Sequence, residues 1–220
     1  MARKQERASV FNIGSVSCVV LLAAPFAFYA ITRGGLIADP TEQATSRFFE
    51  TNATWASSGL YIHMVTGGLV TLLAPLQLLS VVRSKIPVVH RLLGYVVAVL
   101  AMLTGIAGLL YIARVGTIGG TWMDMGFGLY GTLMVLFAAR TIGLARDKDP
   151  KHPVWAVRLI ILALASWFYR VHYGIWEIAT GGIGTRPDFT GPFDLVQVFA
   201  FYVPYLLAFE LWRKRTFRAH

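Results

Sequence analysis

The chain has 220 residues, of which 56% are hydrophobic and 14% charged, and its formal net charge is +9. Soluble domains carry about 25% charged residues, whereas here apolar blocks of about 20 residues alternate with short polar stretches. Because only helices satisfy their own backbone hydrogen bonds in lipid, this pattern predicts an all-α polytopic membrane protein and excludes a separate soluble domain. In such a protein the positive charge indicates membrane orientation and not nucleic-acid binding.

Six apolar segments are long enough to cross a membrane. The first follows a short basic N-terminus, and we expect a retained helix instead of a signal peptide because the apolar run is long and has no small-x-small cleavage site. Polar residues 33–58 precede the second segment, and a basic turn at 83–91 precedes the third. In the sixth, Pro192 is expected to begin the helix, Asp194 to cap it and Pro204 to kink it. The predicted spans are residues 10–32, 59–82, 92–113, 122–139, 154–176 and 192–212.

These segments predict a single transmembrane domain, residues 1–220, in which spans two to five form a four-helix core and spans one and six lie at the periphery. With six spans both termini lie on one side, and that side carries 15 of the 20 lysines and arginines. Because cytoplasmic loops hold the excess of positive residues, both termini are predicted to be cytoplasmic. We therefore expect an integral protein of a bacterial cytoplasmic membrane, with the lipid bilayer as its partner.

Four of the five histidines fall in two layers. His63 and His172 each lie about four residues, or roughly 6 Å, inside the outer end of a span. His90 and His152 lie at the inner boundary, just before the third and fifth spans. Imidazole ligates haem iron, and ionisable groups inside a membrane are costly and usually functional. We therefore predict that His63 and His172 are iron ligands of haem b, with His90, His152 and Arg158 as further cofactor-binding residues.

The faces that carry these histidines leave other ligands open. Gly67 shares the helical face of His63, and Phe168 shares that of His172, so each face is small or flat beside the imidazole. Such faces admit a quinone as well as a macrocycle. A metal ion, a proton relay and simple local hydrogen bonding are further alternatives, the last of them above all for the inner pair.

The leading functional interpretation is a membrane redox protein that binds haem b or a quinone and passes electrons across the membrane to a redox partner. The alternative is a non-catalytic membrane component, or a carrier of small molecules or protons, whose histidines are structural. The chain has no GxSxG, HExxH, P-loop or GxGxxG motif, so the sequence assigns no enzyme class.

Several short motifs resemble a known family. They are His63-Met64-Val65-Thr66-Gly67, Ala74-Pro75-Leu76-Gln77-Leu78, His90-Arg91-Leu92-Leu93-Gly94-Tyr95, and His152 with Trp155 and Arg158. Over about residues 59–176 the sequence is similar to the DUF2306 family of bacterial membrane proteins, with Ala74 where the family pattern has glycine. The resemblance implies a multi-pass membrane protein and no particular activity. A weaker resemblance is to two-haem b561-type cytochromes, although their histidines are spread over four helices.

Overall fold

The computed structural model describes the backbone of residues 2–218 and the side chains of residues 12–216. Within this range every regular element is a helix and there is no strand, so the predicted all-α class is confirmed. The helices are α1 (Ala2–Gly35), α2 (Pro40–Thr45), α3 (Thr54–Leu73), α4 (Ser80–Lys85), α5 (Pro87–Arg114), α6 (Gly120–Arg146), α7 (His152–Thr180), α8 (Pro192–Ala200) and α9 (Val203–Arg218), with short 3-10 turns η1 (Leu36–Ala38), η2 (Thr51–Ala53) and η3 (Ala74–Leu78).

Five helices of the described chain are long and apolar enough to cross a membrane, namely α1, α3, α5, α6 and α7. A sixth span arises if α8 and α9 are taken together, because the two are separated by a short break and bent by 42°. Pro204 lies in the first turn of α9, directly after the break, where a proline removes no helical hydrogen bond. The protein is therefore a polytopic helical bundle.

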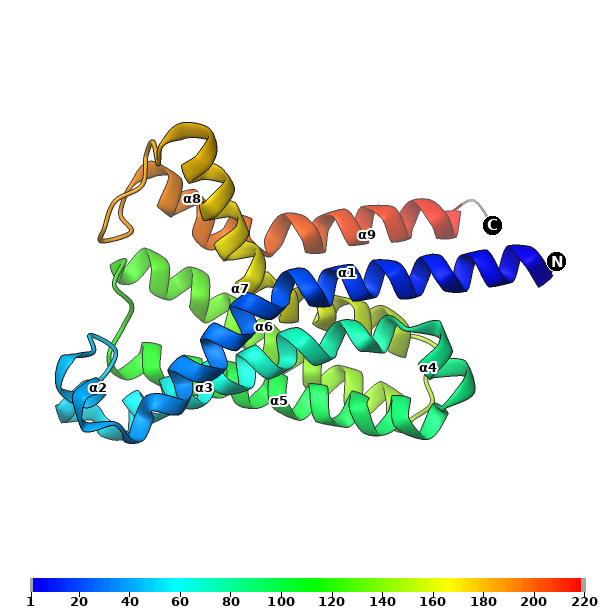
Figure 1. Ribbon diagram of the computed structural model, residues 1–220, viewed down its shortest axis with the longest axis horizontal. Coiled ribbons are helices and arrows are strands. Elements are labelled where there is room, and N and C mark those ends of the chain that lie inside the picture. The colour runs from blue at the N-terminus through cyan, green and yellow to red at the C-terminus, as the bar shows by residue number, and fades with distance from the viewer. Residues whose placement is uncertain (1, 219–220) are drawn as a thin grey trace.

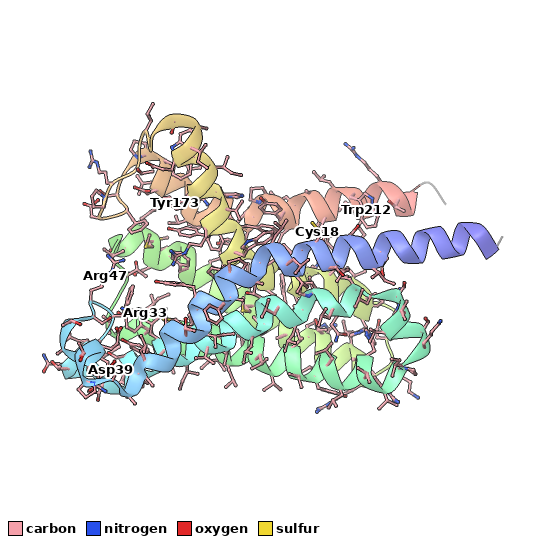
Figure 2. The ribbon with its side chains drawn as sticks, viewed as in Figure 1. Cys18, Arg33, Asp39, Arg47, Tyr173 and Trp212 are labelled. Carbon is pink, nitrogen blue, oxygen red and sulfur yellow. The ribbon has the colours of Figure 1, made fainter. Side chains whose placement is uncertain are left out.

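The two ends of the bundle differ in what they carry. Figure 1 shows both ends of the chain and α4 at one end and α2 at the other. We call these the inner and outer ends, after the orientation that the charges predict. Figure 2 shows Arg33, Asp39 and Arg47 toward the outer end and Trp212 toward the inner end. Four of the basic residues assigned to the inner side have side chains outside the described residues, namely Arg3, Lys4, Arg7 and Arg218. The orientation of the protein in the membrane therefore stays a prediction.

Glycines let neighbouring helices approach closely. A Cβ atom on Gly68 of α3 would lie 2.8 Å from the carbonyl oxygen of Ala27 and 2.7 Å from Cγ1 of Ile31, both in α1. On α5, a Cβ atom at Gly105 would lie 2.9 Å from the carbonyl oxygen of Gly131 in α6. In a membrane, where no hydrophobic force pulls helices together, such backbone contact is a main source of packing energy.

The centre of the bundle is packed by small and medium apolar side chains of α3, α5, α6 and α7, as the predicted four-helix core requires. They include Val70, Val97, Ala98, Ala101, Met134, Ala138, Leu162 and Ala165. Phe201 and Tyr202, at the break between α8 and α9, are also fully buried and pack against Tyr130. The sixth span therefore enters the core at its break, although the sequence predicted a peripheral helix.

A buried carboxylate ties three elements together at the outer end. Glu42 of α2 forms a salt bridge with Arg33 of α1 at 2.7 Å, and the hydroxyl of Tyr61 in α3 donates to Glu42 at 2.6 Å. The side chains of Glu42 and Tyr61 are both buried. These bonds fix α2 across the outer ends of α1 and α3.

The contact between α1 and α3 predicts the effect of adding one methyl group. Gly68→Ala should lower the free energy of unfolding by about 1–3 kcal/mol, because the new Cβ meets the α1 backbone, which cannot move aside as a flexible side chain can. Thermal unfolding in mild detergent would measure this change. Gly143→Ala is the matched control, since a Cβ there meets nothing within 4 Å, and equal melting temperatures for the two variants would contradict the close contact.

The Glu42 cluster predicts a dependence of stability on pH. The hydrogen bond from Tyr61 holds the pKa of the Glu42 carboxyl below its ordinary value of 4.5, and Arg33 acts in the same direction. A carboxyl with a lowered folded-state pKa stabilises the fold above its unfolded-state pKa, and this contribution is lost as the pH falls through the folded value.

Glu42→Gln should therefore melt below the wild type at neutral pH, and the two should converge as the pH falls below about 4. Glu177→Gln serves as the control, because Glu177 is exposed and has no ion pair among the described residues. A constant difference between Glu42→Gln and wild type across this range would contradict the assignment.

Candidate functional site

His63 is held in one orientation by the backbone of the neighbouring helix. Its Nδ1 lies 2.8 Å from the carbonyl oxygen of Thr104 in α5. A helical side chain leans back over the preceding turn, so a residue with a side chain at position 108 would cover this carbonyl. Gly108 leaves it open, and a Cβ there would lie only 2.9 Å from the imidazole Nδ1.

This bond decides which hydrogen-bonding group His63 has left to offer. A carbonyl oxygen can only accept, so Nδ1 carries the proton and donates. In the neutral imidazole Nε2 is then an acceptor with a free lone pair. Nε2 makes no hydrogen bond to any residue that the structure describes.

His63 lines a large cavity between α3, α5, α6 and α7, which we call the outer cavity. Its volume is about 550 Å³, and a smaller cavity of about 180 Å³ shares the His63 wall. The lining is mostly apolar and reaches the outer loops at Phe48, Ile118 and Phe189. Phe189 has a φ of +57°, a conformation that is costly for a bulky residue and often occurs at binding sites. The outer cavity thus runs from these loops into the bundle.

Few polar groups of the outer cavity remain free. The hydroxyl of Tyr130 donates to the Leu162 carbonyl at 2.7 Å, and that of Thr104 donates to Leu100. Arg47 and Arg170 also line the cavity, and neither has an ion pair among the described residues. The groups left to meet a ligand therefore include Nε2 of His63, the two guanidinium groups and the hydroxyl of Tyr111, which also lines the cavity and has no hydrogen bond among the described residues.

Arg170 is a site residue that the sequence did not identify. A charged residue near the end of a span is usually taken to reach toward the membrane surface. On α7, however, Arg170 follows Ser166 by one turn and lines the same cavity as Ser166 and Tyr169. The spacing of these three residues is the signal that points to the cavity face of α7.

His172 faces away from this cavity. It lies two positions after Arg170, or about 200° around the helix, and contacts α8 and α9. The side-chain amide of Gln197 lies 2.9 Å from Nδ1 of His172, and the hydroxyl of Tyr205 lies 2.7 Å from Nε2. Both ring nitrogens thus have protein partners.

The structure therefore does not bring His63 and His172 to one cavity. Haem ligation by this pair would require His172 to lose both hydrogen-bond partners and α7 to rotate so that this side chain reaches the outer cavity. The haem b site therefore remains a prediction without support from the geometry. The same holds for the resemblance to b561-type cytochromes.

Asp194 fixes the start of α8 beside this part of α7. It is fully buried, and its Oδ2 accepts from the backbone N–H of Gly191 at 2.9 Å, so it helps to cap the helix from the third helical position, while Gly191 is the N-cap residue itself. Its Oδ1 accepts from the hydroxyl of Tyr173 at 2.7 Å. Figure 2 shows Tyr173 at this junction.

The inner histidines, in contrast, lie together. His90 and His152 line a second cavity of about 200 Å³, the inner cavity, between η3 and the inner ends of α5, α6 and α7. Nδ1 of His152 lies 3.1 Å from the carbonyl oxygen of Thr141, to which it donates. Pro153 lies in the first turn of α7 and leaves the helix unbroken.

Arg158 has a different role from the one the sequence suggested. Its Nη2 and Nε lie 2.6 and 2.7 Å from Oε1 of Glu210 in α9, and its guanidinium stacks over Trp155. Arg213 binds the other oxygen of Glu210. Arg158 thus joins α7 to α9 and lines neither the outer nor the inner cavity, so its role in cofactor binding stays a prediction.

Comparison with known proteins finds one matching family model. A family model described as "Predicted membrane protein (DUF2306)" matches residues 60–213, which run from α3 through most of α9. No curated protein and no solved structure matches the chain.

The partners of His172 predict the effect of removing one hydroxyl. Tyr205→Phe leaves Nε2 of His172 without its partner in a partly buried site, which should lower the free energy of unfolding by about 1–2 kcal/mol. Thermal unfolding in mild detergent measures the loss. Tyr29→Phe is the control, because Tyr29 is half exposed and its hydroxyl has no partner among the described residues. Equal stability of the two variants would show that His172 is not held in this way.

Proposed function

The chain belongs to the DUF2306 family of predicted membrane proteins, and we propose that this membrane protein binds the ring of a quinol or quinone in the outer cavity. The family description specifies the membrane and no activity. The proposal therefore rests on the chemistry of the cavity itself.

The orientation of His63 carries the proposal. With Nδ1 committed to the Thr104 carbonyl, Nε2 is an acceptor placed on the wall of an apolar cavity. A quinol offers two hydroxyl groups at opposite ends of a planar ring, and one of them can donate to this nitrogen. Arg170 lines the same cavity and supplies N–H donors for a ring oxygen, in the quinol as well as in the oxidised quinone.

The size and lining of the outer cavity support the same ligand. Binding pockets for small molecules typically measure about 300–1,000 Å³ and combine apolar walls with a few polar groups. Here Gly105, Gly108 and Gly131 give a flat wall, and Phe127 and Tyr169 add aromatic surface. A flat, apolar ring with polar atoms at its edges fits such a lining.

Haem b suits the outer cavity less well. A six-coordinate haem needs a second axial ligand, and of the two predicted iron ligands only His63 lines this cavity. Electron transfer across the membrane, and the redox partner that it requires, depend on quinone binding and remain predictions. If no quinone binds, the alternative is a non-catalytic component or carrier with structural histidines.

Purified protein in mild detergent tests this proposal by calorimetric titration with a quinol analogue that has a shortened tail. We expect wild-type protein to bind and His63→Leu, which removes the acceptor and keeps most of the volume, to bind about tenfold more weakly. Gly108→Ala should weaken binding as well, because its methyl group displaces the imidazole.

Gly128→Ala is the matched control on α6, where a Cβ meets nothing within 4 Å, and it should bind as the wild type does. Undiminished binding by His63→Leu would overturn the proposed site. A Soret band in protein expressed with ample haem, lost in His63→Leu, would favour haem over quinone.

A further inference from the structure

The inner cavity carries a positive charge that nothing in its lining balances. Two imidazoles and two guanidiniums line it, from His90, His152, Arg83 and Arg91, and no carboxylate does. Neither arginine has an ion pair among the described residues. The cavity lies beside α4, at the inner end in Figure 1.

Two hydrogen-bonding groups in this lining have no partner. Of the described side chains, the buried nitrogen and oxygen atoms without a hydrogen bond are Nε2 of Gln77 and Nδ1 of His90, and both residues line the inner cavity. A buried donor left unpaired is costly, and most such groups have a protein, water or ligand partner. The amide of Gln77 can only donate through Nε2, so the missing partner is an acceptor.

The other groups around the cavity also suit an acceptor with negative charge. Because Nδ1 of His152 donates to the Thr141 carbonyl, Nε2 becomes a further donor only when the ring is protonated, and a bound anion favours that charged form. The helices α5 and α7 both begin at this cavity, with His90 and His152 in their first turns. A helix N-terminus carries partial positive charge, which favours an anion.

We propose that the inner cavity binds a phosphate group. Phosphate presents several acceptor oxygens in different directions, which matches donors that come from η3, α5 and α7. A metal ion fits poorly, because the arginines would repel it and the described residues hold no cluster of three or more metal-ligating side chains.

The phosphate can belong to an anionic lipid or to a soluble molecule, since the chemistry that binds it is the same. Tyr95 of α5 lines the cavity and is itself exposed, and Val88 and Leu92 of the same helix are exposed as well, which gives a lipid tail an apolar surface to lie on. A soluble phosphate would enter from the inner aqueous side and would not use this surface.

Thermal unfolding of the full chain in mild detergent tests the site and separates the two sources. We expect short-chain phosphatidylglycerol to raise the melting temperature more than phosphatidylcholine with the same acyl chains does. A rise with inorganic phosphate alone identifies a soluble ligand instead. If neither phosphatidylglycerol nor inorganic phosphate raises the melting temperature beyond the phosphatidylcholine control, the proposal is wrong.

Two variants and a matched control give the test its specificity. Arg83→Gln should weaken affinity for the stabilising ligand by roughly tenfold or more, because it removes a charged donor from the lining. Lys85→Gln removes the same charge two residues away, outside the lining, and should stay within about twofold of the wild type. Equal losses in both would mean general attraction to a basic surface, and the site would be rejected.

Gln77→Met separates ligand binding from a structural role. This variant removes the unpaired donor and keeps a similar volume, so the protein without ligand should be at least as stable as the wild type while its affinity falls about tenfold. A destabilised variant with unchanged affinity would show that Gln77 is structural and would overturn the proposal. His63→Leu alters only the outer cavity and should leave phosphate binding unchanged, so this inference and the quinone proposal can fail separately.

Discussion

The close approach of α5 to its neighbours is the constraint on which the outer cavity depends. Gly105 lets α6 come within contact of its backbone, and Gly108, about one turn later, leaves the Thr104 carbonyl open to His63. A side chain at either position would push α6 away or cover the acceptor. The two glycines thus determine both the width of the cavity and the tautomer of the histidine in its wall. Within a membrane, where water cannot replace a missing partner, that bond is also what makes a histidine tolerable.

The sequence predicted which residues share a helical face, but not which neighbouring helix that face meets, and the depth of the histidines in the membrane stays a prediction. Counting residues at a fixed rise placed His63 and His172 near the same level, and the helical period grouped Phe168 with His172. In the structure the rings of both Phe168 and His172 stack on Tyr205. Which neighbour this face meets depends on packing against the sixth span, far along the chain, so the sequence could not show that Arg170 faces the outer cavity in place of His172.

At the inner end the sequence grouped His90 with His152 but did not group Gln77 with them. Gln77, His90 and His152 belong to the motifs that carry the family resemblance, and positions 77 and 152 are 75 residues apart in the sequence. They meet because η3 and the start of α5 lie beside the start of α7, an arrangement of connections that no local pattern encodes. Pro153 lies in the first turn of α7, where a proline removes no helical hydrogen bond, and the Thr141 carbonyl fixes the ring of His152.

A packed layer separates the two cavities. On α5 the outer cavity ends at Thr104 and the inner cavity at Val97, about two helical turns or 10 Å apart. The layer between them includes Ala101, Ala138 and Leu162, which are fully buried and carry no ionisable group. A proton relay or a carrier that worked along the bundle would have to open this layer, whereas two ligands that bind from opposite sides need no such motion. The structure therefore favours two separate sites, and any coupling between them must pass through α5, α6 and α7, the helices that both cavities share.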